Sequence, residues 1–301
     1  MRIACIGDAH YSAMRWRTKA LKDQNEFFYN KIFASLFAQE ADLYISLGDL
    51  THFGSRSEFR AVYKMINSHR KENQRFENVV GNHDLLVQTK ASYQSLTGSK
   101  LYWAEDYEDV KLIFMDTSRA LRPGKNSSSI SWEQQEFVKR ELEEAGEKLA
   151  VIFAHHPPER MIFRNEKGRV DKSLNLEQIL SHKKGRGVVV NGHLHKDRFY
   201  TRGDWGFLQF NDLLDEPTIR CLNIKDGKVT MSTVSFTQHE MVHATRNITL
   251  ALLTFRRVDN PWEFARVREL TLSTPNQVPM TGWTMDYLST LDPDQARRRR
   301  F

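Results

Sequence analysis

The sequence has few cysteines and no long apolar run, and both absences narrow what the chain can be. Cys5 and Cys221 are its two cysteines in 301 residues, too few for a disulfide framework. No stretch approaches the roughly 20 apolar residues that cross a bilayer. The opening MRIACIGDAH runs straight into a strand pattern, which predicts no secretory leader. We therefore expect a cytoplasmic protein that does not bind a membrane.

A strong charge of one sign is also absent. Lys and Arg number 44 against 38 Asp and Glu, which leaves a formal net charge of +6. This excess permits an anionic substrate but does not favour nucleic acid as a partner. With 40% hydrophobic and 27% charged residues, the chain has the balance of a folded globular protein rather than a disordered one. Histidine, in contrast, is plentiful: there are eleven.

Short apolar runs alternate with helical patterns over most of the chain. The predicted strands are 2–6, 43–47, 78–80, 111–115, 149–154 and 187–190. The predicted helices are 19–39, 57–72, 132–145 and 176–182, the third opened by Ser131 and Gln134 as a capping box. The near-continuous apolar runs indicate strands covered on both faces. This alternation predicts an α/β fold with a largely parallel central sheet.

The pattern changes after Pro217. Segments 218–224 and 228–236 flank an Asp-Gly turn and predict a β-hairpin. Residues 247–258 look strand-like, and four Arg stand at 297–300. We predict a catalytic domain over 1–236 and a C-terminal extension over 237–301. The extension is a candidate surface for self-association into a homo-oligomer.

Five polar motifs stand at the ends of predicted strands. They are Asp8-Ala9-His10, Gly48-Asp49, Gly81-Asn82-His83-Asp84, His155-His156-Pro157-Pro158 and Gly192-His193-Leu194-His195. Ligands of α/β sheets bind beyond the carboxyl ends of the strands, and residues two apart at a strand end point to the same side. We therefore expect these side chains to converge on one site.

The motifs supply carboxylate, amide and imidazole ligands and no thiolate. That mixture favours Mn, Fe or Zn over a cysteine-based structural zinc site. The candidate ligands exceed what one ion needs and predict two ions that share a carboxylate. They are Asp8, His10, Asp49, Asn82, His155, His193 and His195.

This order of motifs resembles that of the calcineurin-like metallophosphoesterase superfamily. G-N-H-D together with H-H-P-P is most similar to the branch that holds class III cyclic-nucleotide phosphodiesterases and bacterial glycerophosphodiesterases. The resemblance covers about residues 1–236. It implies a four-layer α/β/β/α sandwich and metal-dependent hydrolysis of phosphate esters, with a small phosphodiester as the expected substrate.

The resemblance also implies a role for each motif residue. The first metal would take Asp8, His10 and His195, the second would take Asn82, His155 and His193, and Asp49 would bridge them. His83 resembles the family's catalytic histidine, which binds no metal. Asp84 or a backbone carbonyl would fix its tautomer.

One position departs from the family pattern. Many relatives carry Asp three residues after the G-D aspartate, where this chain has His52. His52 is expected either to contact substrate or to be an ordinary loop residue. His156 is expected to lie beside the metals or to face substrate. The basic loops 117–130 and 159–173 would either hold an anionic substrate or remain solvated surface loops. The candidate substrate contacts in the second loop are Arg160 and Arg164.

Three alternatives to a phosphodiesterase stay open: a phosphomonoesterase, a nuclease, and a non-catalytic scaffold on the same fold. The small net charge gives a nuclease little support. The complete set of ligand positions argues against a scaffold. We therefore predict a binuclear phosphoesterase with two divalent or trivalent transition metals, Mn, Fe or Zn, and in-line attack by a metal-bridging hydroxide.

Overall fold

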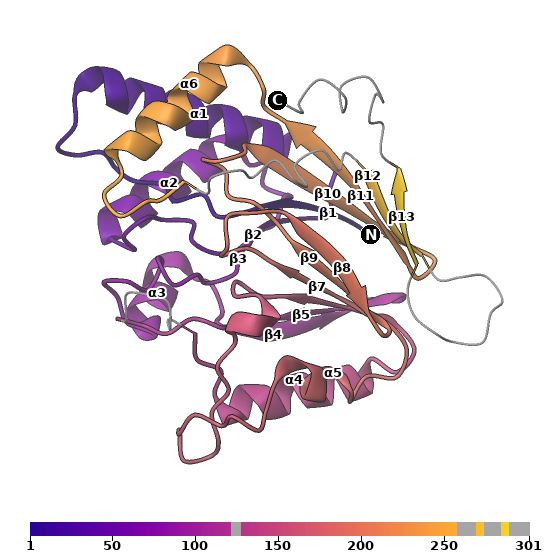
Figure 1. The fold of residues 1–301 in the computed structure, drawn as a ribbon. Helices are drawn as coiled ribbons and strands as arrows, with labels where there is room; N and C mark the ends of the chain where they lie inside the picture. The colour runs from indigo at the N-terminus through magenta and orange to yellow at the C-terminus, as the bar shows by residue number, and fades with distance from the viewer. Residues whose placement is uncertain (122–127, 258–268, 274–283, 289–301) are drawn as a thin grey trace, which may run out of the picture.

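Two β-sheets lie face to face, with helices on both outer faces (Figure 1). The computed structural model describes residues 1–121, 128–257, 269–273 and 284–288. The four layers are those of the α/β/β/α sandwich that the resemblance implied. Within the described residues, no helix is long and apolar enough to cross a bilayer.

The first sheet has the strand order β13-β12-β11-β10-β1-β2-β3. Its strands are β1 (Arg2–Ile6), β2 (Leu43–Ser46), β3 (Phe76–Asn78), β10 (Thr218–Lys225), β11 (Lys228–Ser235), β12 (Glu269–Ser273) and β13 (Thr284–Leu288). β1, β2 and β3 run parallel, whereas β10 pairs antiparallel with β1 and forms the predicted hairpin with β11. The sheet therefore mixes both pairings.

The second sheet has the order β4-β5-β6-β7-β9-β8. Its strands are β4 (Trp103–Asp106), β5 (Val110–Phe114), β6 (Leu149–Phe153), β7 (Gly187–Asn191), β8 (Arg198–Arg202) and β9 (Trp205–Gln209). The inner four strands are parallel, and β4 and β8 pair antiparallel at the edges. The single, largely parallel sheet expected from the alternation is therefore two mixed sheets, each with a parallel centre.

Helices cover the two outer faces. The helices of the described residues are α1 (Lys19–Phe37), α2 (Arg56–His69), α3 (Lys90–Thr97), α4 (Trp132–Glu144), α5 (Leu176–Leu180) and α6 (His239–Ala251), with a short 3₁₀ turn η1 (Pro158–Arg160). Figure 1 shows α1, α2 and α6 over the first sheet and α4 and α5 over the second. Ser131 caps α4 as expected. The other half of the predicted capping box is wrong, because the Gln134 side chain binds the backbone N–H and carbonyl of Asp116.

The central strands are buried on both faces, as their apolar runs predicted. In β1, Ile3 and Cys5 pack between the sheets, whereas Ala4 and Ile6 pack under the helices. In β6 the same alternation divides 149–153 between the inter-sheet core and the core beneath α4 and α5. Rigid strands of this kind hold the polar residues that follow them in fixed positions.

The strand expected over 247–258 is wrong, because His239–Ala251 form α6. Met241, Ala244 and Ile248 recur at helical spacing and are buried in the same core as α1. This packing outweighs the β-branched residues that suggested a strand. The sheet is extended instead by β12 and β13.

Self-association through the C-terminal extension stays a prediction. The division of the chain after residue 236 stays a prediction, although α6 packs beside α1 within the first core. The arginines at 297–300 lie outside the described residues.

A buried ion pair connects the two sheets near the carboxyl end of β7. Arg220 in β10 binds the carboxylate of Asp197, which precedes β8, and both side chains are almost fully buried. Arg220 also donates to Thr233 Oγ1 at 2.6 Å. The pair ties the sandwich together beside the motif that ends at His195.

Removing one partner of this pair leaves a buried charge without its counter-ion. We expect Arg220→Met to lower the free energy of unfolding by about 3–5 kcal/mol. The control is Lys148→Met, which breaks the exposed pair with Asp106 and is expected to cost less than about 1 kcal/mol. Urea denaturation of both variants measures the difference. Equal losses of unfolding free energy would show that the buried Arg220–Asp197 pair contributes no more to stability than the exposed pair does.

Candidate metal centre

The five motifs meet where the parallel strands of the two sheets end. Asp8 and His10 follow β1, Asp49 follows β2, and Asn82 comes shortly after β3. From the second sheet, His155 follows β6, and His193 and His195 follow β7. The structure therefore brings together all seven side chains predicted to bind metal.

One group of ligands lies at the end of β1. Asp8, His10 and His195 each place a ligand atom within 4.8 Å of the others. His10 Nε2 and His195 Nε2 are 3.0 Å apart, and His195 Nε2 is 3.5 Å from Asp8 Oδ2. Two ring nitrogens directed at each other and at a carboxylate are a suitable donor set for a transition metal.

The second group lies around His155. Its Nε2 is 3.0 Å from Asn82 Oδ1, 3.2 Å from His193 Nδ1 and 3.3 Å from Asp49 Oδ2. The same Asp49 oxygen is 3.9 Å from His10 Nε2 in the first group. One carboxylate oxygen therefore faces both groups, as the resemblance implied for a bridging ligand.

The backbone is held in an unusual conformation at this site. Four candidate ligands have positive φ angles between 46° and 75°: Asp49, His10, His195 and His193. Such non-glycine residues cost about 1–3 kcal/mol each and persist where the surroundings enforce them. Gly81 and Gly192 allow the close packing, since a Cβ on the first would overlap Asp49 and on the second the Asp8 carboxylate. The site is thus built at the expense of local stability.

The charges of the buried site balance in a way that favours cations. Burial alone would raise the pKa of Asp49, but the imidazoles of His155 and His83 hold it well below its usual value. Conversely, burial opposes a charge on His155, yet Asp49 and Asp8 raise its pKa to about 9. Without metals, the carboxylates therefore draw protons onto imidazoles, and cations would take the place of those protons.

Neighbouring groups orient the ligand rings. His155 Nδ1 donates to the carbonyl of Leu47 at 2.9 Å, which leaves the Nε2 lone pair for the cluster. His195 Nδ1 lies 3.5 Å from the carboxylate of Asp212, which helps raise the pKa of His195 to about 10 against the effect of burial. Sequence reasoning missed Asp212. The available signal was its place just after an apolar strand, like the other motif residues.

His83 lies against Asp49, the residue expected to bridge the two metals. Its backbone N–H donates to Asp49 Oδ1 at 2.7 Å, and its Nδ1 donates to the carbonyl of His52 at 2.6 Å. Of the two groups expected to fix its tautomer, the backbone carbonyl is the one in contact. Nε2 is the nitrogen that this contact does not use.

Asp84 has a different environment from the one expected. Its buried carboxylate accepts hydrogen bonds from Leu50 N, Thr51 N and Oγ1, Asn78 Nδ2 and Gly81 N. Burial raises its pKa to about 6. Asp84 therefore holds together the loops that carry Asp49 and His83. The His83 ring is oriented by the backbone carbonyl of His52.

The four candidate substrate contacts lie in different settings. His156 is buried beside His193, with ring centroids 4.3 Å apart, and its Nδ1 is 2.9 Å from Thr117 Oγ1. His52 is fully buried. Arg160 is exposed in η1, whereas Arg164 donates to Ser129 Oγ in the first basic loop and to the carbonyl of Gly168 in its own loop. Contact of these residues with substrate stays a prediction, and residues 122–127 of the first basic loop lie outside the described residues.

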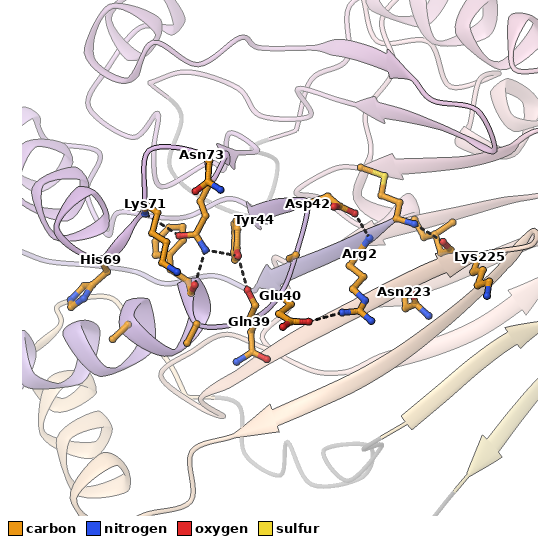
Figure 2. A pocket seen from close by; sticks show the side chains of 17 residues that line it. Arg2, Gln39, Glu40, Asp42, Tyr44, His69, Lys71, Asn73, Asn223 and Lys225 are labelled. Carbon is orange, nitrogen blue, oxygen red and sulfur yellow. Dashed lines mark hydrogen bonds and ion pairs between the residues drawn. The ribbon is translucent and has the colours of Figure 1, made fainter.

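A pocket of about 880 Å³ lies at the other end of the first sheet, where β1 and β2 begin (Figure 2). It is lined at the start of β1 and β2 and the end of α1. Its polar groups bind one another: Arg2 binds Glu40 and Asp42, and Gln74 donates to Tyr44. None of the metal-ligand clusters found among the described residues lies there, so the metal cluster is the stronger candidate for chemistry.

Comparison with solved structures finds proteins that are similar to this chain. A dimetal phosphatase from Danio rerio has a similar fold, with a TM-score of 0.60 and 12% identity over 78% of this chain and 96% of that one. Purple acid phosphatase PPD1 from yellow lupin gives 0.49 and 12% over 78% and 51%. Zinc-bound Vps29 from Entamoeba histolytica gives 0.38 and 14% over 79% and 94%. No curated protein matches.

The family assignment comes from the sequence match. The family model described as calcineurin-like phosphoesterase matches residues 1–197, which carry every predicted ligand. The fold, the ligand clusters and this match lead to one conclusion: the chain belongs to the calcineurin-like phosphoesterase family, which indicates a metal-dependent phosphoester hydrolase.

Proposed function

We propose that this protein is a binuclear phosphodiesterase that hydrolyses a small phosphodiester. The observation that carries the proposal is Asp49 Oδ2, which faces His155 at 3.3 Å and His10 at 3.9 Å. A shared carboxylate between two ligand groups fits two metals, whereas a single-metal site has no use for it. Complete ligand groups also argue against a non-catalytic scaffold.

The chemistry divides between the metals and the chain. Two cations held by these ligands would acidify a water and stabilise the attacking and leaving oxygens of an in-line displacement. The strand ends position the ligands, and the buried carboxylates balance the cationic charge. His83, fixed through Nδ1, presents Nε2 as the atom that gives a proton to the leaving oxygen or a hydrogen bond to the phosphoryl group.

The finer points rest on the sequence. Preference for a diester comes from the resemblance of G-N-H-D and H-H-P-P to the phosphodiesterase branch. Mn, Fe or Zn follows from the mixture of imidazole, carboxylate and amide ligands. The net charge of +6 supports a small anionic substrate better than nucleic acid. The two free cysteines agree with the cytoplasmic location that we propose.

Metal binding should release protons. His155 and His195, with pKa values raised to about 9 and about 10, are protonated near neutral pH and must lose those protons to act as ligands. We expect two Mn or Zn ions per chain, release of about two protons, and affinity that rises as pH increases from neutral toward 9. Calorimetry in buffers of different ionisation enthalpy measures both quantities. Less than one ion per chain, or affinity that falls with pH, would contradict the binuclear site.

His83→Ala should separate chemistry from metal binding. Because His83 contributes no ligand, metal content should stay at the wild-type value, while kcat falls by about 10²–10⁴-fold through loss of the proton donor. The control is His243→Ala, an exposed histidine on α6 that should change neither quantity. Wild-type turnover in the His83 variant would remove it from the mechanism.

Two chromogenic substrates distinguish the proposed activity from its alternatives. We expect bis(p-nitrophenyl) phosphate to be hydrolysed with a higher kcat/KM than p-nitrophenyl phosphate. A preference for the monoester would make the protein a phosphomonoesterase. Strong competition by single-stranded DNA against the diester would favour a nuclease.

A further inference from the structure

The chain that follows α6 turns back onto the metal centre. Residues 252–257, here called the strap, are attached at both ends. Arg17 donates to the carbonyl of Ala251 at 2.5 Å, and Arg257 Nε binds Asp215 Oδ1 at 2.9 Å. Thr254, a β-branched residue, has a φ of 72°, which such residues rarely adopt. The strap is therefore held in a costly conformation by its contacts.

One strap carbonyl fixes the tautomer of His52. His52 Nε2 lies 2.8 Å from the carbonyl oxygen of Leu253. A carbonyl can only accept, so Nε2 carries the hydrogen. With the hydrogen on Nε2, the neutral ring of His52 has its lone pair on Nδ1.

That lone pair faces a predicted metal ligand. His52 Nδ1 is 3.4 Å from His10 Nδ1. Because His52 Nδ1 is an acceptor, the hydrogen between the rings belongs to His10 Nδ1. The lone pair of His10 is then on Nε2, the atom that faces His195 and Asp49. The strap carbonyl thus determines which nitrogen of His10 can bind metal.

A strap side chain packs on the same ligands. The ring of Phe255 stacks on His195 with centroids 5.2 Å apart and a 25° interplanar angle. It also meets His10 edge to face, at 5.3 Å and 80°. Two ligand rings of the first group therefore pack against the strap.

We propose that the strap completes the first metal site, with His52 and Phe255 as positioning residues. Leu253 orients His52, His52 orients His10, and Phe255 keeps the rings of His10 and His195 in place. This gives His52 a role in the position where many relatives carry Asp. The inference rests on the proposed function, because it takes His10 and His195 as ligands of the first metal.

Two substitutions of His52 separate its two contacts. The Oδ1 of Asn can replace the Nδ1 acceptor, whereas Gln can replace only the Nε2 donor toward Leu253. We expect His52→Gln to weaken binding of the first Mn by about 10–100-fold, and His52→Asn to restore most of the affinity. Phe255→Ala should weaken the same site. Calorimetric titration with Mn measures all three variants against the wild type.

The matched control is Leu250→Ala on α6. This leucine lies outside the strap and is 81% exposed, so Mn affinity should not change. Wild-type affinity in both His52→Gln and Phe255→Ala would overturn the strap's role while leaving the proposed function intact. A wild-type chain that binds no metal would instead remove the proposed function.

Imidazole ¹⁵N spectra of the metal-free wild-type protein test the relay without any substitution. We expect a hydrogen on Nε2 of His52 and a hydrogen on Nδ1 of His10. The opposite tautomer at His10 would refute the relay, whether or not the variants fold.

Discussion

The carboxylate of Asp49 is the constraint on which the rest of the site depends. It receives a hydrogen bond from the backbone of His83, faces His155, and lies within reach of His10. A buried carboxylate of this kind requires positive charge nearby, which protons on imidazoles or metal cations can supply. The folded chain places imidazoles on both sides of this carboxylate. Four of the ligands, Asp49 among them, have positive φ angles in this arrangement.

The ligand set could be predicted from sequence because it lies on rigid elements. Asp8, Asp49 and His155 each come shortly after the end of a buried strand, and the apolar runs predicted where those strands end. Convergence then follows from the general rule that parallel strands gather their carboxyl ends at one edge. The two sheets, in contrast, could not be separated by local pattern, since pairing partners depend on contacts distant in sequence.

The parts that sequence reasoning missed depend on tertiary contacts. The helix α6 was mistaken for a strand because β-branched residues masked the spacing of its buried face. Asp84 binds the loop at Thr51 and does not orient the His83 ring, and Asp212 lies beside His195. These two contacts depend on how separate loops pack. The return of the strap to the metal centre has no local signal at all, since Leu253 meets His52 across 201 residues of sequence.

The most direct test of the account is an anomalous diffraction map from crystals soaked in Mn. We predict two peaks about 3.5–4 Å apart on either side of Asp49, one bound by Asp8, His10 and His195 and the other by Asn82, His155 and His193. A single peak, or two peaks that do not share Asp49, would contradict the binuclear centre.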